Sequence, residues 1–395
     1  MTEVQRSVNY RLLVPLMAHG LLVQVMIGMF RITTSYRVLE LELPVAWVGL
    51  VATSFAIFPV FLAVKVGRYI DRTHDADAAR IGSVLCVIAS AGLLFFATTP
   101  FAIMGWMIAL GIGHLFLMAA HQMLCVRAAG EHHRDKVFGN FLMMTGFGQG
   151  LGPLIVAWVG GDARVPDTFF LYSIGLAAAV AVGVIAIFLT PAKEAMHKAQ
   201  GAAQMSLKEL LRINGLVTVL IASVITMSAQ DLIVVYLPLL GIERGIGVAD
   251  IGMMLTVRSA AAVFSRIGYS QLIRAVGRVR LTFLTMCLAG LSFVLIVLPL
   301  ALPLLYVAAF CLGLGLGLAS ALSLTSVVEL APASARATAL SLRITGNRLG
   351  QASLPFIGSV LASAAGAAGV LGVIGICLII SGASVQVVRG RQGAS

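Results

Sequence analysis

The chain has few charged residues for its length. Asp, Glu, Lys and Arg make up only 11% of its 395 residues, and 59% are hydrophobic. Soluble domains contain about a quarter charged residues, so this chain has too few to cover a surface in water. That scarcity excludes a cytosolic enzyme and a disordered protein. The basic excess, 27 Lys and Arg against 16 Asp and Glu, lies in short clusters between apolar segments. It forms no basic domain of the kind that binds nucleic acid.

Cysteine pairs and nucleotide-binding motifs are also lacking. Five cysteines stand far apart in apolar segments: Cys86, Cys125, Cys287, Cys311 and Cys377. This spacing predicts buried small hydrophobic residues, with neither a disulfide framework nor a metal-binding pair. The pattern Gly-x-x-x-x-Gly-Lys-Ser/Thr is absent, which argues against ATP-driven pumping. We expect no cofactor, no metal and no enzymatic activity.

Long continuous apolar segments dominate the chain. A transmembrane helix needs about 20 apolar residues, whereas an outer-membrane barrel shows alternating segments of about 10. The sequence therefore predicts an all-α polytopic membrane protein with twelve transmembrane helices in two pseudo-symmetric six-helix bundles. The predicted spans are 11–32, 45–66, 79–98, 101–126, 137–159, 168–190, 214–240, 250–269, 280–299, 302–328, 340–364 and 366–387.

A polar segment at 191–213 separates six predicted spans from the other six. We expect an N-terminal six-helix bundle at 1–190, a cytoplasmic central loop at 191–213 and a C-terminal six-helix bundle at 214–395. Within the loop, residues 206–211 have the pattern of a short amphipathic helix on the membrane surface.

Lys and Arg are distributed unevenly between alternate loops, and this bias sets membrane orientation. With the N-terminus inside, the outer segments hold only Arg31, Arg37, Arg164 and Arg244, while most other basic residues fall inside. The bias predicts a multi-pass protein of the cytoplasmic (inner) membrane with both termini in the cytoplasm.

The two halves match each other at an offset near 200. Thr145-Gly146 matches Thr345-Gly346, Gly150 matches Gly350, Gly113 matches Gly313, and Gly49 matches Gly252 at offset 203. Parallel six-helix repeats of this kind describe a transporter whose site lies between the halves near the bilayer midplane.

The loop after the second span begins with Gly67 and contains Asp71 and Arg72. It resembles the first half of the G-x-x-x-D-R-x-G-R-R signature of the major facilitator superfamily (MFS), but residues 73–75 replace its Gly-Arg-Arg. The loop after the eighth span retains the other half. The resemblance implies a gating motif that helps close the cytoplasmic side, formed by Gly67, Asp71, Arg72, Arg274, Gly277 and Arg278. The alternative is that these charges only set topology.

Gly148, Gly152 and Pro153 lie in the fifth span and resemble the antiporter motif of the drug–proton exchangers in this superfamily. The sequence departs from that motif at Val156-Ala157, where two glycines are usual. Glycines four apart let helices approach closely, and proline kinks a helix. The motif therefore favours antiport, with small-residue packing as the alternative.

His114 and His121 lie seven residues apart in the fourth span, nearly on one helix face. The arginine that drug exporters often carry in this span is absent. Because histidine titrates near physiological pH, the two histidines are candidate proton carriers. Alternatively, His121 meets water at the inner end and His114 bonds to a neighbouring helix.

Charged residues inside the membrane are costly and usually face a partner or a cavity. The predicted spans contain Arg31, Asp231, Arg258 and Arg348. We hypothesise that Asp231 pairs with Arg31, its symmetry mate at offset 200, or with Arg258 in the adjacent span, and that substrate or a proton breaks the pair. A static salt bridge is the alternative. Four weaker candidates for the cavity wall are His19, Gln24, Gln149 and Gln351.

These features predict a secondary transporter that exports a small organic compound, anionic or zwitterionic, by proton-coupled alternating access. An importer that carries an organic anion together with protons is the main alternative. A non-transporting receptor or scaffold and a channel are more distant ones. The expected partners are the substrate, protons and the lipid bilayer, with no nucleic acid, and the resemblance implies a working monomer.

Overall fold

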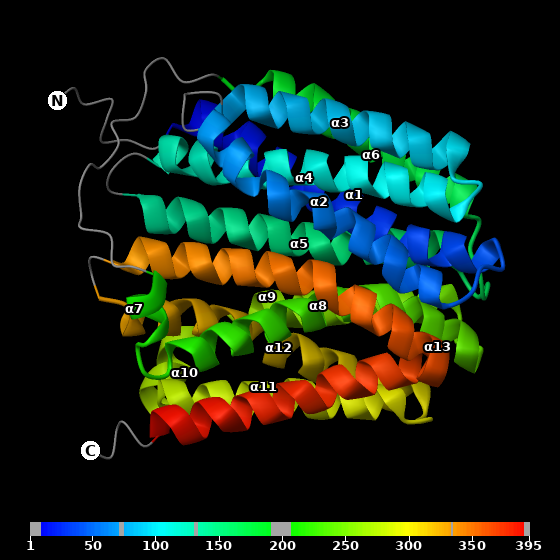
Figure 1. Ribbon diagram of the computed structural model, residues 1–395. Helices are drawn as coiled ribbons and strands as arrows, with labels where there is room; N and C mark the ends of the chain where they lie inside the picture. Colours follow the sequence, from blue (N-terminus) through cyan, green and yellow to red (C-terminus); the bar gives the residue numbers. More distant parts are fainter. Residues whose placement is uncertain (1–8, 71–74, 130–132, 191–206, 333–334, 391–395) are drawn as a thin grey trace. The chain divides into compact units, whose positions relative to one another are not determined.

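The computed structural model describes residues 9–70, 75–129, 133–190, 207–332 and 335–390. All regular structure in these ranges is helical (Figure 1). The chain divides into two compact units, and parts of helices α8 and α9 belong to each. Unit 1 comprises residues Met1–Lys198 and Gly241–Thr256, and unit 2 comprises Ala199–Leu240 and Val257–Ser395.

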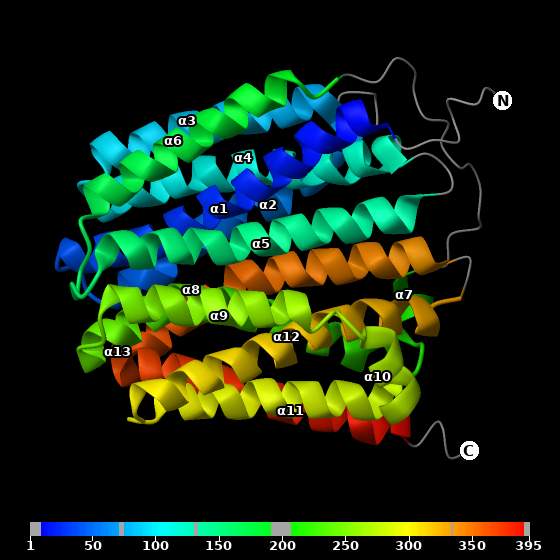
Figure 2. The same ribbon diagram turned by 180° about the vertical axis from the view of Figure 1, so that it is seen from behind.

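Unit 1 contains six complete helices in chain order. They are α1 (Tyr10–Glu40), α2 (Ala46–Ile70), α3 (Asp75–Phe96), α4 (Pro100–Ala129), α5 (Arg134–Gly160) and α6 (Thr168–Ile187). Helix α4 packs against α2 and α3, while α1 packs against α5 and α6. Figure 2 shows the same unit from behind.

The remaining helices belong wholly or partly to unit 2. They are α7 (Leu207–Leu211), α8 (Leu216–Arg244), α9 (Val248–Phe264), α10 (Tyr269–Val276), α11 (Arg278–Val297), α12 (Leu302–Leu330) and α13 (Arg336–Gly390). Helix α11 packs against both α12 and α13.

The predicted spans correspond to these helices with two differences. Among the described residues, ten helices are long and apolar enough to cross a membrane. Two predicted spans lie in α13, which is broken at Gly366, where a φ of 63° is non-helical. Helix α9 has only 17 residues and ends at Phe264, because the chain turns through Gly268 (φ 80°) into α10. The all-helical membrane fold is confirmed.

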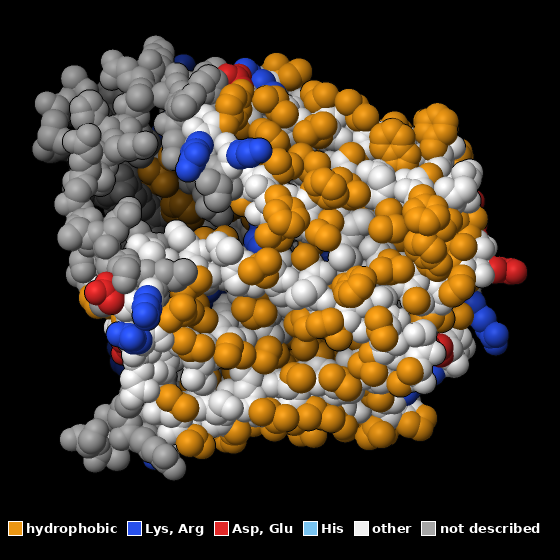
Figure 3. Space-filling view, viewed as in Figure 1, with side chains coloured by type: hydrophobic (Ala, Val, Ile, Leu, Met, Phe, Trp, Pro, Cys, Tyr) orange, Lys and Arg blue, Asp and Glu red, His pale blue; other side chains and the backbone are white. Residues whose placement is uncertain are grey.

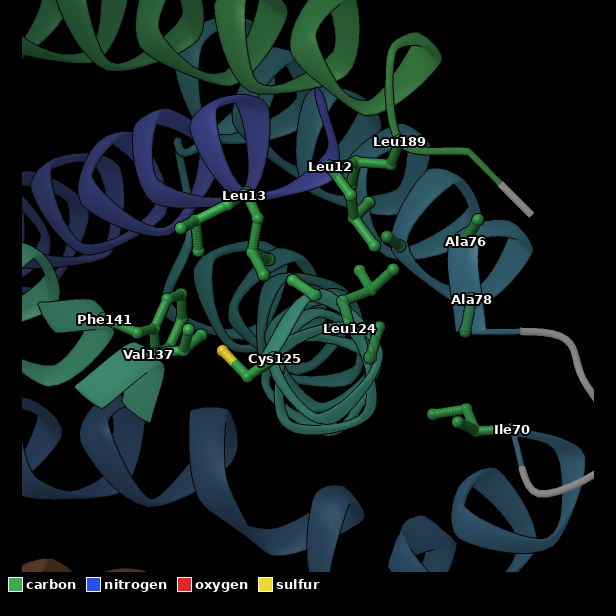
Figure 4. Packing of buried hydrophobic residues seen from close by; sticks show 14 of the residues in the cluster. Leu12, Leu13, Ile70, Ala76, Ala78, Leu124, Cys125, Val137, Phe141 and Leu189 are labelled. Carbon is green, nitrogen blue, oxygen red and sulfur yellow. The ribbon is translucent and has the colours of Figure 1, made fainter. Parts of the chain in front are cut away.

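Apolar side chains fill the inner part of unit 1 and also cover its surface. Figure 4 shows Leu12 and Leu13 of α1 packing near Leu124 of α4, with Phe141 of α5 on another side. Large hydrophobic side chains are exposed on the helices, among them Phe61, Phe101 and Trp158. Figure 3 shows hydrophobic side chains across most of the described face. A surface of this kind fits a lipid environment.

The cysteines are all free thiols. Cys86 and Cys125 are buried, as expected, whereas Cys287, Cys311 and Cys377 are only half-buried. The prediction of burial is therefore wrong for the three cysteines of unit 2. In a membrane protein a thiol on the outer face of a helix contacts lipid rather than water, so its exposure is not unfavourable.

Glycine contacts reveal the internal repeat in three dimensions. A Cβ on Gly111 of α4 would overlap the carbonyl oxygen of Phe55 in α2. In unit 2, a Cβ on Gly313 of α12 would overlap the carbonyl oxygen of Arg258 in α9. The two glycines therefore serve equivalent close helix crossings, and Phe55 and Arg258 occupy equivalent positions.

The next glycine of α4 and the next glycine of α12 also lie at equivalent helix crossings. Gly113 packs against Cys86 of α3, and Gly315 packs against Thr285 of α11. By these contacts Gly113 corresponds to Gly315. The sequence match of Gly113 with Gly313 is therefore wrong by two residues, because an offset of 200 is not constant along the chain.

Candidate functional site

A carboxylate and an arginine lie near each other in the membrane helices of unit 2. Asp231 stands on α8 and Arg348 on α13, and both are half-buried. Asp231 lies close enough to act on the Arg348 guanidinium electrostatically. Arg348 Nη1 also donates a hydrogen bond to Gln351 Oε1 at 3.3 Å. Gln351, a weaker candidate in the sequence, thus helps hold this arginine.

Arg258 on α9 is 7% exposed, and its Nη2 donates to Ser259 Oγ at 3.1 Å. Its counterpart in the repeat is Phe55, whose ring lies 5.7 Å from the guanidinium carbon of Arg31. Arg31 in turn corresponds to Asp231 at offset 200. The repeat therefore assigns Asp231 and Arg258 to positions whose counterparts in unit 1 are in contact.

Arg31 and Asp231 belong to different units. In unit 1, Arg31 lies on α1 and is half-buried, and its carbonyl oxygen accepts a hydrogen bond from Ser35 Oγ at 3.2 Å. Its guanidinium lies over the face of Phe55, a position typical of a cation–π interaction.

A buried pair of histidines joins three helices of unit 1. His19 Nδ1 on α1 lies 2.7 Å from His121 Nε2 on α4, and His19 Nε2 lies 3.2 Å from Ser83 Oγ on α3. His19 is 0% and His121 1% exposed, so the expectation that His121 meets water is wrong. His114 acts electrostatically on His121 and lies beside Phe55, with ring centroids 5.6 Å apart.

The hydrogen bonds of this group define which nitrogens carry protons. Ser83 Oγ donates to Ala79 O at 2.7 Å, so the Ser83 oxygen must accept from His19 Nε2. Neutral His19 then has a bare Nδ1, which accepts from His121 Nε2. His121 Nδ1 is left as a buried acceptor with no hydrogen-bond partner among the described residues.

The glycines of the antiporter-like motif bring α5 against α1. A Cβ on Gly148 would lie 2.9 Å from Gln24 Cβ, and one on Gly152 would lie 2.8 Å from Val25 O. Across the same contact, Gln149 Nε2 lies 3.5 Å from Gln24 Oε1. The close approach that such spacing permits is therefore present.

The motif continues toward α9. A Cβ on Gly252 of α9 would lie 2.6 Å from the carbonyl oxygen of Pro153 and 2.7 Å from Ala157 Cβ. Thr256 Oγ1 donates to Gly150 O at 3.1 Å. The family motif has a glycine at the position of Ala157. In this chain the glycine at that helix contact is Gly252, on the facing helix α9.

Of the gating-motif residues, Asp71 and Arg72 lie outside the described residues. A Cβ on Gly67 would meet no atom within 4 Å. Gly277, at φ 81°, separates α10 from α11, and Arg274 lies in the last turn of α10. Arg278 Nη1 pairs with Glu329 Oε2 of α12 at 2.5 Å. The second loop motif thus ties α11 to α12 within unit 2.

A buried ion pair near the first loop was not foreseen from the sequence. Arg127 Nε of α4 lies 3.0 Å from Asp75 Oδ2 at the start of α3, and the Asp75 side chain is 2% exposed. Arg127 Nη2 also donates to Thr190 O at 2.5 Å. In the sequence Asp75 is a departure from the family signature, yet it anchors the adjoining ends of α3 and α4.

The sequence profile of the Major Facilitator Superfamily matches residues 16–302 and 219–392. The chain belongs to the Major Facilitator Superfamily. It is therefore a multi-pass secondary transporter rather than an enzyme. No curated protein matches the chain.

Solved structures of MFS transporters share its fold along nearly the full length. The nucleoside transporter NupG is 14% identical, with a TM-score of 0.73, covering 95% of this chain and 98% of its own. A bacterial homolog of the human lysosomal transporter Spinster is 12% identical, with a TM-score of 0.77 and coverage of 95% and 96%. The peptide transporter POT in complex with sulfate is 14% identical, with a TM-score of 0.74 and coverage of 96% and 94%. At these identities the likeness shows the fold alone.

Proposed function

We propose that this MFS transporter exports a small anionic or zwitterionic organic compound in exchange for protons. In this proposal, bundles 1–190 and 214–395 rock about a midplane site, and 191–213 connects them on the cytoplasmic side. The direction of transport is inferred from the resemblance of Gly148, Gly152 and Pro153 to the antiporter motif.

The electrostatic coupling of Asp231 to Arg348 carries the proposal. A carboxylate in a membrane helix stays ionised most readily beside a cation. An ionised Asp231 can bind the ammonium group of a zwitterionic substrate while Arg348 binds its carboxylate, and a proton on Asp231 removes the charge that holds the ammonium group. Proton and substrate then compete for the same pair of groups, which is a direct way to exchange one for the other.

The surplus of arginines supports an anionic group on the substrate. Arg258 and Arg348 both lie in unit 2 with Asp231, and Arg31 occupies the counterpart of Asp231 in unit 1. Guanidinium groups bind carboxylates and phosphates with two parallel hydrogen bonds. A cationic drug would instead require an excess of carboxylates.

The proton gradient is the proposed energy source. Moving one charge through 100 mV releases about 2.3 kcal/mol, enough for substantial accumulation. His114 and His121 are proposed as additional proton carriers in unit 1, and His121 Nδ1 is a buried nitrogen with no hydrogen-bond partner among the described residues. The loop residues Asp71, Arg72, Arg274, Gly277 and Arg278 are proposed to stabilise the closed cytoplasmic side.

Untargeted mass spectrometry of medium and cytosol tests the proposal. Cells expressing the wild type are compared with cells expressing Asp231→Asn and with cells lacking the transporter. Glu243→Gln serves as a matched control, because Glu243 is an exposed carboxylate on the same helix. We expect a compound enriched in the medium and depleted in the cytosol for wild type and Glu243→Gln only. The opposite partition would indicate import, and equal export by Asp231→Asn would rule out the coupling role of Asp231.

A further inference from the structure

Arg343 is a buried cation in the first part of α13. It lies near the start of the predicted span 340–364 and is 8% exposed. Its hydrogen-bond partners lie on α12, next to Ser223 of α8. The apolar residues Val219, Val327 and Ala339 belong to a buried cluster that lies about one turn away along the helices.

Within the described ranges, Arg343 donates hydrogen bonds through only one of its three nitrogens. Nη2 donates to Ser323 Oγ at 3.0 Å and to Ser320 O at 3.3 Å. Nε is buried and has no partner among the described residues. Because a guanidinium has five N–H donors, most of its donor capacity is unused.

Asn347 lies one turn after Arg343 on the same face of α13. Its Oδ1 accepts a hydrogen bond from Ser223 Oγ of α8 at 3.0 Å, and Ser223 lies 3.5 Å from Ser323. With its oxygen held by Ser223, the Asn347 amide nitrogen has its donors left for another group. Arg343 and Asn347 thus carry unused N–H donors on neighbouring turns of the same face of α13, and both side chains are buried.

No carboxylate in the described part of the chain forms an ion pair with Arg343. A buried charge without a counter-ion is strongly unfavourable. Arg127 differs in this respect, because it lies beside Asp75. A bound anion would supply the counter-ion that the buried Arg343 guanidinium lacks among the described residues.

We propose that Arg343 and Asn347 form a binding site for an oxyanion, a carboxylate or phosphate group. One oxygen of the anion would accept a hydrogen bond from an unused donor of Arg343, Nε–H or Nη1–H, and the Asn347 amide would donate to a second oxygen. Ser323 and Ser223 hold the two side chains in position. This site is separate from Asp231 and does not depend on the proposed direction or coupling of transport.

Thermal unfolding of the full-length protein in lipid nanodiscs tests the site. A thiol-reactive fluorophore follows unfolding through the five free cysteines, of which Cys86 and Cys125 lie in unit 1 and Cys287, Cys311 and Cys377 lie in unit 2. Tryptophan fluorescence follows unit 1 separately, because every tryptophan lies in that unit. Three arms distinguish the source of the anion at constant ionic strength: sodium phosphate, sodium propionate, and phosphatidylglycerol added to phosphatidylcholine nanodiscs. In at least one arm, the midpoint should rise by about 5–10 °C at about 100 times the Kd.

Three variants assign the response to the site. Arg343→Gln should abolish it without lowering the midpoint in the absence of anion, since an amide still donates to Ser323 and the uncompensated charge is gone. Asn347→Asp should also abolish it and raise the midpoint, because it supplies a counter-ion one turn away. Arg336→Gln removes an exposed arginine from the same helix and should keep the wild-type response.

The proposal is overturned if none of the three arms shifts the wild-type midpoint. It is also overturned if Arg343→Gln and Asn347→Asp respond as the wild type does. Should Arg343→Gln fail to fold, Asn347→Asp decides alone, because its side chain has the size and shape of asparagine.

Discussion

His19 and His121 form a side-chain hydrogen bond of 2.7 Å across 102 residues of sequence, buried between α1 and α4. Ser83 extends the contact to α3. In lipid, helices associate through packing and polar contacts rather than through exclusion of water. These contacts therefore contribute to how α1, α3 and α4 of unit 1 are assembled, whether or not the histidines also carry protons.

Replacing His121 by leucine should lower the free energy of unfolding by about 1–2 kcal/mol, because His19 Nδ1 then loses its donor inside the bundle. His121→Gln can still donate to His19 and should cost less. Unfolding of the purified protein in mixed micelles measures both. Equal stability of His121→Leu and the wild type would show that the bond adds nothing.

The same two variants separate packing from proton transfer. A glutamine at 121 keeps the donor to His19 but cannot take up a proton at neutral pH. If His121 carries protons, His121→Gln should lose pH-gradient-driven export while keeping its fold, and the pH profile of export should change. An unchanged profile would leave His121 with a structural role alone.

Breaking the Asp75–Arg127 pair should destabilise unit 1. Asp75→Ala leaves a buried guanidinium without its partner, which costs about 3–5 kcal/mol in protein interiors. Asp77→Ala is the matched control, because Asp77 pairs with Arg80 three residues later at the surface, with side chains 45% and 38% exposed. Surface pairs of this kind contribute about 0.3–0.5 kcal/mol. Similar losses from the two substitutions would contradict the structure.

Adding a methyl group at Gly152 should weaken the contact of α1 with α5. The new Cβ would press on the backbone oxygen of Val25 at 2.8 Å, and such overpacking typically costs about 1–3 kcal/mol. Gly139→Ala, on the same helix, meets no atom within 4 Å and should stabilise the helix by about 1 kcal/mol. The two unfolding curves should move in opposite directions, and a shift in the same direction would argue against the close approach.

Exchanging the charges of Asp231 and Arg348 tests whether they form a functional pair. Asp231→Arg and Arg348→Asp should each abolish export, because each places two like charges together. The double variant should recover part of the activity if the pairing itself matters. Two inactive singles and an equally inactive double would show that each residue has its own position-specific role.

The helices were predictable from the sequence because apolar length alone marks a membrane span. The kink at Gly366 coincides with the boundary between two predicted spans, and α7 lies where an amphipathic segment was expected. The end of α9 was misplaced, because the predicted span was continued through Ser265, Arg266 and Gly268 to residue 269, whereas the helix ends at Phe264.

The contacts of the candidate sites were harder to foresee. The pairing of His19 with His121 and of Asp75 with Arg127 depends on how each helix is rotated about its axis. Rotation is set by packing, and a mostly apolar helix has no clear polar face to reveal it. The repeat offset is not constant between helices, so Phe55 could be matched with Arg258 only from their glycine contacts.

The most direct test of proton-coupled export uses purified protein in proteoliposomes and the compound that the metabolite comparison identifies. With an acidic lumen and a neutral bath, protons leave the vesicles. Proton-coupled export predicts that the wild type then accumulates the compound in the lumen, that Asp231→Asn does not, and that dissipating the gradient with a protonophore abolishes accumulation. Movement of the compound outward with the protons, or uptake that ignores the gradient, would contradict it.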